Sequence, residues 1–348
     1  MITSLEDSLG NLHSDHQTKA NIFWEAYKDR LGQSEFTSML LDLGSLLRAH
    51  QDLSFLEEPF THEEIHLVVA SLPSDKSLRP DGFNTDFIKK YWPIIKHDFY
   101  NLCQEFFIGN ICLQSINGSY IILVPKIDGP SRVNDFRPIS LLNISMKIIT
   151  KLLANRLQRV IQELIHKKKY GFIQTRTIQV CLAWALEYLH MCHSSRKKIV
   201  ILKLDFEKTF DKVEHHAMLS IMQQKGFGPK WISCMQHIFN SGTSSVLLNS
   251  VPGKVFHCKR GVRQGDPLSP LLYVLASDLL QSMVNKARSD NILHLPIPLQ
   301  HSQDFPILQY ADDTLVIMEA CQDQLLALRT SCMISQLPQV SKSISQSQ

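Results

Sequence analysis

Acidic side chains follow two apolar runs that are about a hundred residues apart in the chain. Asp205 ends the run 199–204, and Asp312 and Asp313 lie in the turn between two further apolar runs. The apolar, β-branched composition predicts strands, the later two forming a hairpin with acids at its tip. Carboxylates that converge at one sheet edge would supply the oxygen ligands that Mg²⁺ prefers, and two ions about 3.5–4 Å apart can stabilise phosphoryl transfer. By itself, however, an Asp-Asp pair is ordinary turn chemistry.

The stretch between these acids contains a second feature suited to ligand contact. Residues 261–270 read Gly-Val-Arg-Gln-Gly-Asp-Pro-Leu-Ser-Pro. Glycines allow the backbone to approach a ligand closely, and Pro267 with Ser269 suits the start of a long helix. Alone, this stretch is a weak signal.

The elements that must position these residues can be predicted from local patterns. Apolar spacing predicts a helix over 141–165 with Ser140 as its cap, a helix over 177–191 and a strand over 119–124. Two more strands are expected to flank a turn near Pro252-Gly253.

The first hundred residues predict helices. Thr61 and Glu64 form a capping-box pattern, and Asn84 is placed to cap a helix over 85–96. A breaker over 77–83 separates the two helices.

Composition bounds the class of protein. The chain has 348 residues, 44% hydrophobic and 20% charged, with a net charge of +3, which excludes collagen-like and low-complexity classes. Its eight cysteines show no Cys-X-X-Cys spacing, and we expect free thiols. We find no signal peptide and no transmembrane segment, and we expect an intracellular protein, in the nucleus or cytoplasm, without a membrane partner.

The basic residues are concentrated in one segment. Residues 147–176 contain eight Lys or Arg and one acid, Glu163. Such a segment is often a solvated helix face, but it is also typical of a surface that binds the nucleic-acid backbone.

Taken together and in this order, these motifs resemble the reverse transcriptases, most closely those of plant LINE-type (non-LTR) retrotransposons. The resemblance covers about residues 60–320. The segments that carry it are 135–141 (DFRPISL), 151–157 (KLLANRL), 202–211 (LKLDFEKTFD), the Gln264-Gly265 block and the Tyr-Ala-Asp-Asp box at 310–313.

The resemblance implies an α+β, right-hand polymerase fold with helical fingers, an antiparallel-sheet palm and no thumb. It implies three regions: a helical N-terminal extension and start of the fingers over 1–105, fingers and palm over 106–320, and a divergent, disordered tail over 321–348. Fewer residues follow the last acid than a thumb domain needs.

The resemblance also implies residue roles. Asp205, Asp312 and Asp313 would be catalytic and bind two Mg²⁺ or Mn²⁺ ions. The residues implied to bind the incoming nucleotide are Lys126, Arg137, Phe210, Gln264 and Gly265. Phe210 would lie under the sugar and exclude a 2′-hydroxyl. Those predicted to bind nucleic acid are Lys151, Arg156, Lys167, Lys168, Lys169 and Arg176.

Relatives commonly carry Gly where this chain has Arg79 and Thr175, and backbone strain is expected there if those positions need positive φ.

The resemblance leaves three candidate functions for the chain. The first is RNA-directed DNA synthesis from an RNA template, a DNA primer and deoxynucleoside triphosphates. The second is an inactive retroelement remnant that at most binds nucleic acid. The third, RNA-templated RNA synthesis, is disfavoured by Phe210. Oligomeric state is left open.

Overall fold

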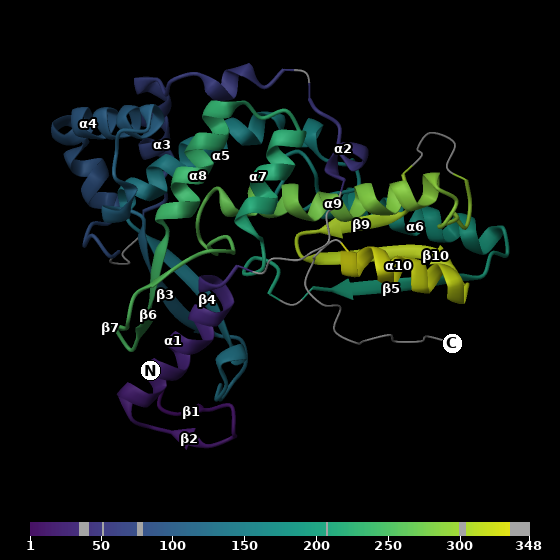
Figure 1. Cartoon of the computed structure of the whole chain (residues 1–348), viewed down its shortest axis with the longest axis horizontal. Coiled ribbons are helices and arrows are strands. Elements are labelled where there is room, and N and C mark those ends of the chain that lie inside the picture. Colours follow the sequence, from purple (N-terminus) through teal and green to yellow (C-terminus); the bar gives the residue numbers. More distant parts are fainter. Residues whose placement is uncertain (35–41, 51, 75–78, 207, 299–303, 335–348) are drawn as a thin grey trace.

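The computed structural model describes residues 1–34, 42–50, 52–74, 79–206, 208–298 and 304–334. Helices and sheets are mixed, which agrees with the predicted α+β class (Figure 1). The breaker predicted over 77–83 lies partly outside the described residues.

The strands form three sheets. The bounds of the strands are β1 (Leu5–Glu6), β2 (Leu12–His13), β3 (Gly118–Pro125), β4 (Phe136–Leu142), β5 (Ile199–Asp205), β6 (Thr243–Leu248), β7 (Val251–Pro252), β8 (Phe256–His257), β9 (Ile307–Tyr310) and β10 (Asp313–Glu319). β1 pairs with β2, β5-β10-β9 form an antiparallel sheet, and β4-β3-β6-β7 form a mixed sheet in which β8 also pairs with β6.

The helices pack around these sheets. The bounds of the α-helices are α1 (His16–Gly32), α2 (Leu43–Leu46), α3 (His62–Ser71), α4 (Thr85–Ile108), α5 (Ile144–Leu164), α6 (Ile178–Ser194), α7 (His215–Gln224), α8 (Pro229–Ser241), α9 (Ser269–Ser289) and α10 (Gln322–Ile334). Single 3₁₀ turns are η1 (Ser54–Glu57), η2 (Leu113–Ser115) and η3 (Val133–Asp135). The predicted capping box of Thr61 and Glu64 is confirmed, and so is the Asn84 cap.

The three-stranded sheet is covered on both faces. Val316 and Met318 of β10 pack with α9 and α10, while Ile317, which points to the other face, packs with α6. This alternation fixes the register of β10 against β5 and β9, because a one-residue slip would exchange its two apolar faces. In Figure 1 this sheet lies at one end of the molecule, and β3, β4 and β6 with α1 lie toward the other.

Two predicted boundaries are corrected. Leu141 and Leu142 belong to β4, and the helix begins at Ile144 after Asn143, because Ser140 is held in the strand by pairing with Ile121 of β3. The hairpin turn lies at Asn249-Ser250, both with positive φ, and Pro252 lies inside β7.

The predicted disordered tail is also corrected for part of its length. Residues 322–334 form α10, and Leu328 is buried under the three-stranded sheet. The rest of that predicted tail, 335–348, lies outside the described residues.

Two further expectations can be compared with the described chain. No described helix is long and apolar enough to cross a membrane. Seven of the eight cysteines, all except Cys332, are free thiols, as predicted.

Candidate active site

The sheet β5-β10-β9 brings the predicted acids to one edge. Asp205, the last residue of β5, pairs in register with Asp313, the first residue of β10. Asp312 lies in the two-residue turn between Tyr310 of β9 and Asp313 of β10. All three acids are exposed. Directly opposed residues of antiparallel strands have Cβ atoms about 4.5–5.5 Å apart. The structure therefore confirms that the two distant acidic segments meet.

The turn that carries Asp312 is held by a segment on the far side of β9. The Tyr170 nitrogen donates to the Gln309 oxygen at 2.7 Å, and the Gln309 nitrogen donates to the Lys168 oxygen at 3.1 Å. Gly171, which follows, has no room for a Cβ because that atom would collide with the backbone nitrogen of Ala311. Ala311 itself has a φ of 52°, an uncommon value for a residue with a side chain.

A basic side chain also contacts the acids. Lys203 Nζ lies 2.8 Å from Asp313 Oδ1. This hydrogen bond raises the pKa of Lys203, with smaller contributions from the charges of Asp313, Asp205 and Asp312.

The acids fit divalent cations by their chemistry, since carboxylate oxygens are the ligands that Mg²⁺ prefers. Among the described residues, however, no three His, Cys, Asp or Glu side chains are gathered into a metal-binding group. The backbone register brings two acids together, while the carboxylate of Asp313 is directed to Lys203.

Phe210 lies in an aromatic stack close to the end of β5. Its ring stacks on Tyr273 of α9 with centroids 4.8 Å apart and meets Phe172 edge-on at 6.2 Å. Phe210 is half-buried, whereas Phe172 is 43% exposed. Burial raises the pKa of Tyr273, so its hydroxyl stays protonated. Phe210 is thus both a packed aromatic and partly open to solvent.

Gln264 and Gly265 form a loop against β4. The Ser140 nitrogen donates to the Gln264 oxygen at 2.6 Å. Gly265 has a φ of +108°, and a Cβ there would lie 2.8 Å from the Ser140 oxygen. The close backbone approach predicted from this glycine therefore exists within the protein, between the loop and the strand.

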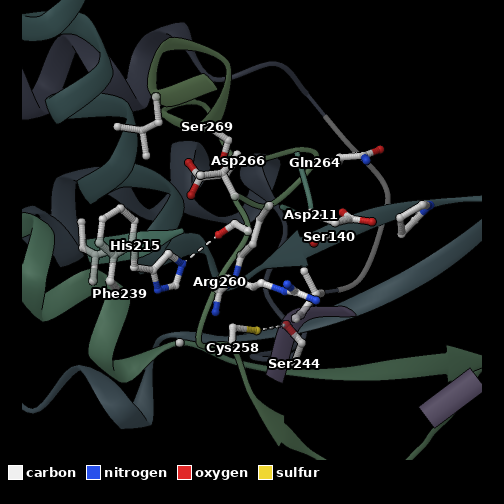
Figure 2. Close-up of a pocket in the computed structure, with 18 of the residues that line it drawn as sticks. Ser140, Asp211, His215, Phe239, Ser244, Cys258, Arg260, Gln264, Asp266 and Ser269 are labelled. Carbon is white, nitrogen blue, oxygen red and sulfur yellow. Dashed lines mark hydrogen bonds between the residues drawn. The ribbon is translucent and has the colours of Figure 1, made fainter. Parts of the chain in front are cut away.

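Behind this loop lies a pocket of about 50 Å³ (Figure 2). His215 donates from Nε2 to the Gly261 oxygen at 2.9 Å and stacks on Phe239 at 4.2 Å. Burial lowers the pKa of His215 to about 4 and raises the pKa values of Asp211 and Asp266. In Figure 2 the amide of Gln264 is directed away from His215. Gln264 lines this pocket at the loop, on the side away from His215.

The two basic residues that are predicted to bind the triphosphate lie on the hairpin β3-β4. Lys126 follows β3, is exposed, and donates from Nζ to the Asn134 oxygen at 2.9 Å. Arg137 is exposed in β4, opposite Val124. In the described part of the chain, no hydrogen bond or ion pair joins either side chain to the acids.

The predicted nucleic-acid surface is wrong for three of its six members, which are buried. Arg156 donates to both oxygens of Glu64. Lys168 lies 4.2 Å above the ring of Trp184. Lys169 donates to Gln309 Oε1 at 2.9 Å. Burial lowers the pKa of Lys168 to about 8 and that of Lys169 to about 7.

The other three members differ in exposure. Lys167 is exposed and Lys151 is half-buried. Arg176 is half-buried, and its guanidinium donates to the backbone oxygens of Gln162, His166 and Lys169. Of this set, only Lys167 and Lys151 keep the exposure that binding to phosphates requires without a described structural role.

A buried ionic cluster lies next to these residues. Asp278 of α9 is fully buried, accepts from His166 at 2.9 Å and lies 3.1 Å from Lys225 Nζ. Burial alone would raise its pKa, but the hydrogen bond from His166 and the charge of Lys225 hold the pKa of Asp278 well below the usual range. The basic segment is therefore anchored to α9. The anchor lies next to residues 168–171, which support the acidic turn.

The backbone strain expected at Thr175 does not occur, because Thr175 has no positive φ. Arg79 donates to the Leu142 oxygen, and Thr175 donates to Gln162.

Three residues near the acids escaped the sequence analysis. Lys203 could have been found from alternation, because residues two apart on a strand share a face. Gly171 and Tyr273 gave no local signal, since their contacts with Ala311 and Phe210 join distant segments.

Comparison with known proteins agrees with this geometry. A family profile described as "Reverse transcriptase (RNA-dependent DNA polymerase)" matches residues 124–345, beyond the end of the predicted resemblance at about 320. Relatives include the "Transposon TX1 uncharacterized 149 kDa protein" of Xenopus laevis, 28% identical over 77% of this chain and 20% of the relative. They also include the Pol polyprotein of element R2DM of Drosophila melanogaster, 26% identical over 68% of this chain and 22% of the relative.

The "RNA-directed DNA polymerase from mobile element jockey" of Drosophila melanogaster is 25% identical over 76% of this chain and 29% of the relative. The chain thus spans between a fifth and three tenths of the length of these relatives. The narrower assignment to a plant element stays a prediction.

Proposed function

Because the chain belongs to the reverse transcriptase family, with relatives in non-LTR retrotransposons, we propose that it carries out RNA-directed DNA synthesis at the edge of β5-β10-β9. The observation that carries this proposal is the register of Asp205 opposite Asp313, with Asp312 in the adjoining turn. In this proposal the three-stranded sheet is the palm, and the hairpin β3-β4 belongs to the fingers of a right-hand polymerase.

The acids offer the carboxylate ligands for the metal ions that such a reaction needs. Reverse transcriptases use divalent metal ions, and here Asp205, Asp312 and Asp313 would hold two Mg²⁺ or Mn²⁺ ions. When bound, the ions stabilise negative charge on the attacking and leaving oxygens. The exposure of all three carboxylates keeps them accessible to cations and to a substrate.

The exposed cations of the fingers would bind the incoming nucleotide. Family membership implies a template, a primer and deoxynucleoside triphosphates as substrates, and Lys126 and Arg137 would contact the triphosphate. Arg137 can offer a two-pronged donor to phosphate oxygens, while Lys126 offers a point charge already held near Asn134. The Gln264 side chain, whose amide is directed away from His215 in Figure 2, would contact the nucleotide or template, and Gly265 keeps the loop close to β4.

Phe210 would select the sugar. Its ring is fixed by Tyr273 and Phe172, so it cannot turn aside freely when a bulkier sugar arrives. A 2′-hydroxyl pressed against the ring would lose water without gaining a partner, at a cost of about 1–3 kcal/mol. This favours DNA synthesis over the RNA-synthesising alternative.

A primer-extension assay tests the proposal. Purified chain should extend a DNA primer on an RNA template with deoxynucleotides and Mg²⁺ or Mn²⁺. Asp205→Asn should lower the rate by about 10²–10³-fold because a ligating charge is lost. Phe210→Ala should raise ribonucleotide use relative to deoxynucleotides about tenfold.

Asp290→Asn is the matched control, because it removes an exposed acid, directly after the C-terminal end of α9, that pairs with Lys286. Its rate should equal that of the wild type. A folded wild-type chain that adds no nucleotide under either metal would contradict the proposal and favour the alternative of an inactive remnant.

A further inference from the structure

Lys203 has an unusual place in β5. The strand reads Ile-Val-Ile-Leu-Lys-Leu-Asp, so Lys203 is its one basic residue. Alternation puts Lys203 on the same face as Asp205, while Leu202 and Leu204 pack in the core on the other face. A lysine at this position is therefore directed to the side of the sheet that carries the catalytic acids.

The contact of Lys203 crosses to the next strand diagonally. Lys203 pairs in register with Leu315, and Asp313 is two residues from Leu315 along β10. Diagonal neighbours of this kind are about 7–8 Å apart at the backbone, within reach of a lysine side chain. The 2.8 Å distance between Lys203 Nζ and Asp313 Oδ1 shows that the lysine side chain makes this diagonal contact.

This ion pair contributes little to folding. The side chains of Lys203 and Asp313 are 66% and 61% exposed, and exposed ion pairs contribute about 0–1 kcal/mol. Its consequence is instead local, because it places a positive charge where the proposed function requires metal ions.

We propose that Lys203 is a positioning residue that competes with divalent cations for Asp313. The inference rests on the proposed function. In the metal-free protein the ammonium holds the Asp313 carboxylate and offsets part of the repulsion among the three acids. A cation that binds Asp313 must displace the ammonium, so Lys203 weakens metal binding and keeps the acids ordered until a cation arrives.

The test measures metal binding, independently of catalysis. Mn²⁺ is titrated into the full chain, and free Mn²⁺ is followed by electron paramagnetic resonance. Lys203→Gln should tighten Mn²⁺ binding about three- to tenfold because one nearby positive charge is removed. Lys203→Arg keeps the charge and should remain within about twofold of the wild type.

Lys198→Gln is the matched control. It removes the same charge from an exposed residue directly before β5, about 23 Å along the strand from Asp205. Its Mn²⁺ affinity should equal that of the wild type, which separates local competition from a change in net charge.

The outcomes separate the two proposals. If Asp205→Asn loses Mn²⁺ affinity but Lys203→Gln leaves it unchanged or weakens it, the metal site stands and the role of Lys203 is overturned. If the folded wild type binds no Mn²⁺, both proposals fail. Circular dichroism of each variant checks that the sheet is folded.

Discussion

Two charged regions of this molecule differ in what their charges do. The acidic edge formed by Asp205, Asp312 and Asp313 is exposed, and its backbone is set by strand register. The basic segment 147–176 sends Arg156, Lys168 and Lys169 into the interior. Both regions suggest function in the sequence, but all three acids are exposed, whereas only part of the basic segment, including Lys167, keeps the exposure that binding to charged ligands requires.

The difference follows from the cost of burying charge. A buried ion needs a partner of opposite charge and further hydrogen bonds, and Asp278 provides this for Lys225 and His166. The acids at the sheet edge keep their water and need only the weak contact with Lys203. The buried part of the basic segment thus acts as a support behind the site, whereas Lys167 and Lys151 remain accessible.

The largest effect is expected from a substitution that breaks the buried cluster around Asp278. Asp278→Ala should lower the free energy of unfolding by about 3–5 kcal/mol, because Lys225 and His166 then lose a buried partner. Urea denaturation at pH 7 measures the change. Asp290→Ala, which removes an exposed acid paired with Lys286, should cost less than about 0.5 kcal/mol. Equal losses in the two variants would remove the distinction between the regions.

A smaller effect appears in the dependence of stability on pH. The folded-state pKa of Lys169 is about 7, below the usual lysine value, so between pH 7 and 9 the unfolded chain binds more protons at this residue. The contribution of Lys169 to the free energy of unfolding therefore rises with pH in that window and falls as the pH is lowered toward 7. Lys169→Met should reduce the slope by about 1 kcal/mol per pH unit.

Urea denaturation at pH 7, 8 and 9 measures that slope. Lys167→Met is the control, because Lys167 is exposed and adjacent in the chain. An unchanged slope in Lys169→Met would mean that burial does not control the protonation of Lys169.

The smallest effect concerns nucleic-acid binding. Lys167→Gln should lower the slope of log K against log salt by just under one for an RNA–DNA hybrid, since it removes at most one phosphate contact. Lys168→Gln should leave the slope unchanged because Lys168 is buried over Trp184. Fluorescence anisotropy at several salt concentrations measures both. A loss in Lys168→Gln that equals the loss in Lys167→Gln would restore the predicted basic surface.

Local rules predicted much of the fold and the acidic part of the site. The Thr61 capping box, the Asn84 cap and the hairpin tipped by Asp312 each depend on residues close in the chain, and all are confirmed. Predicted element boundaries were wrong where pairing with another segment of the chain determines the local structure. Ser140 pairs with Ile121 in a strand although its apolar neighbours continue a helical pattern.

The sequence by itself determined the family, through its motifs, and the apolar runs that form β5 and β10. The strands follow from local composition, whereas the pairing that brings Asp205 opposite Asp313 joins segments far apart in the chain. Only the tertiary structure decided which charges are buried, that Asp313 contacts Lys203, and that Gly171 lies against Ala311. Burial and contact depend on segments that are far apart in the chain, because the free energy of a charge is set by what surrounds it in space.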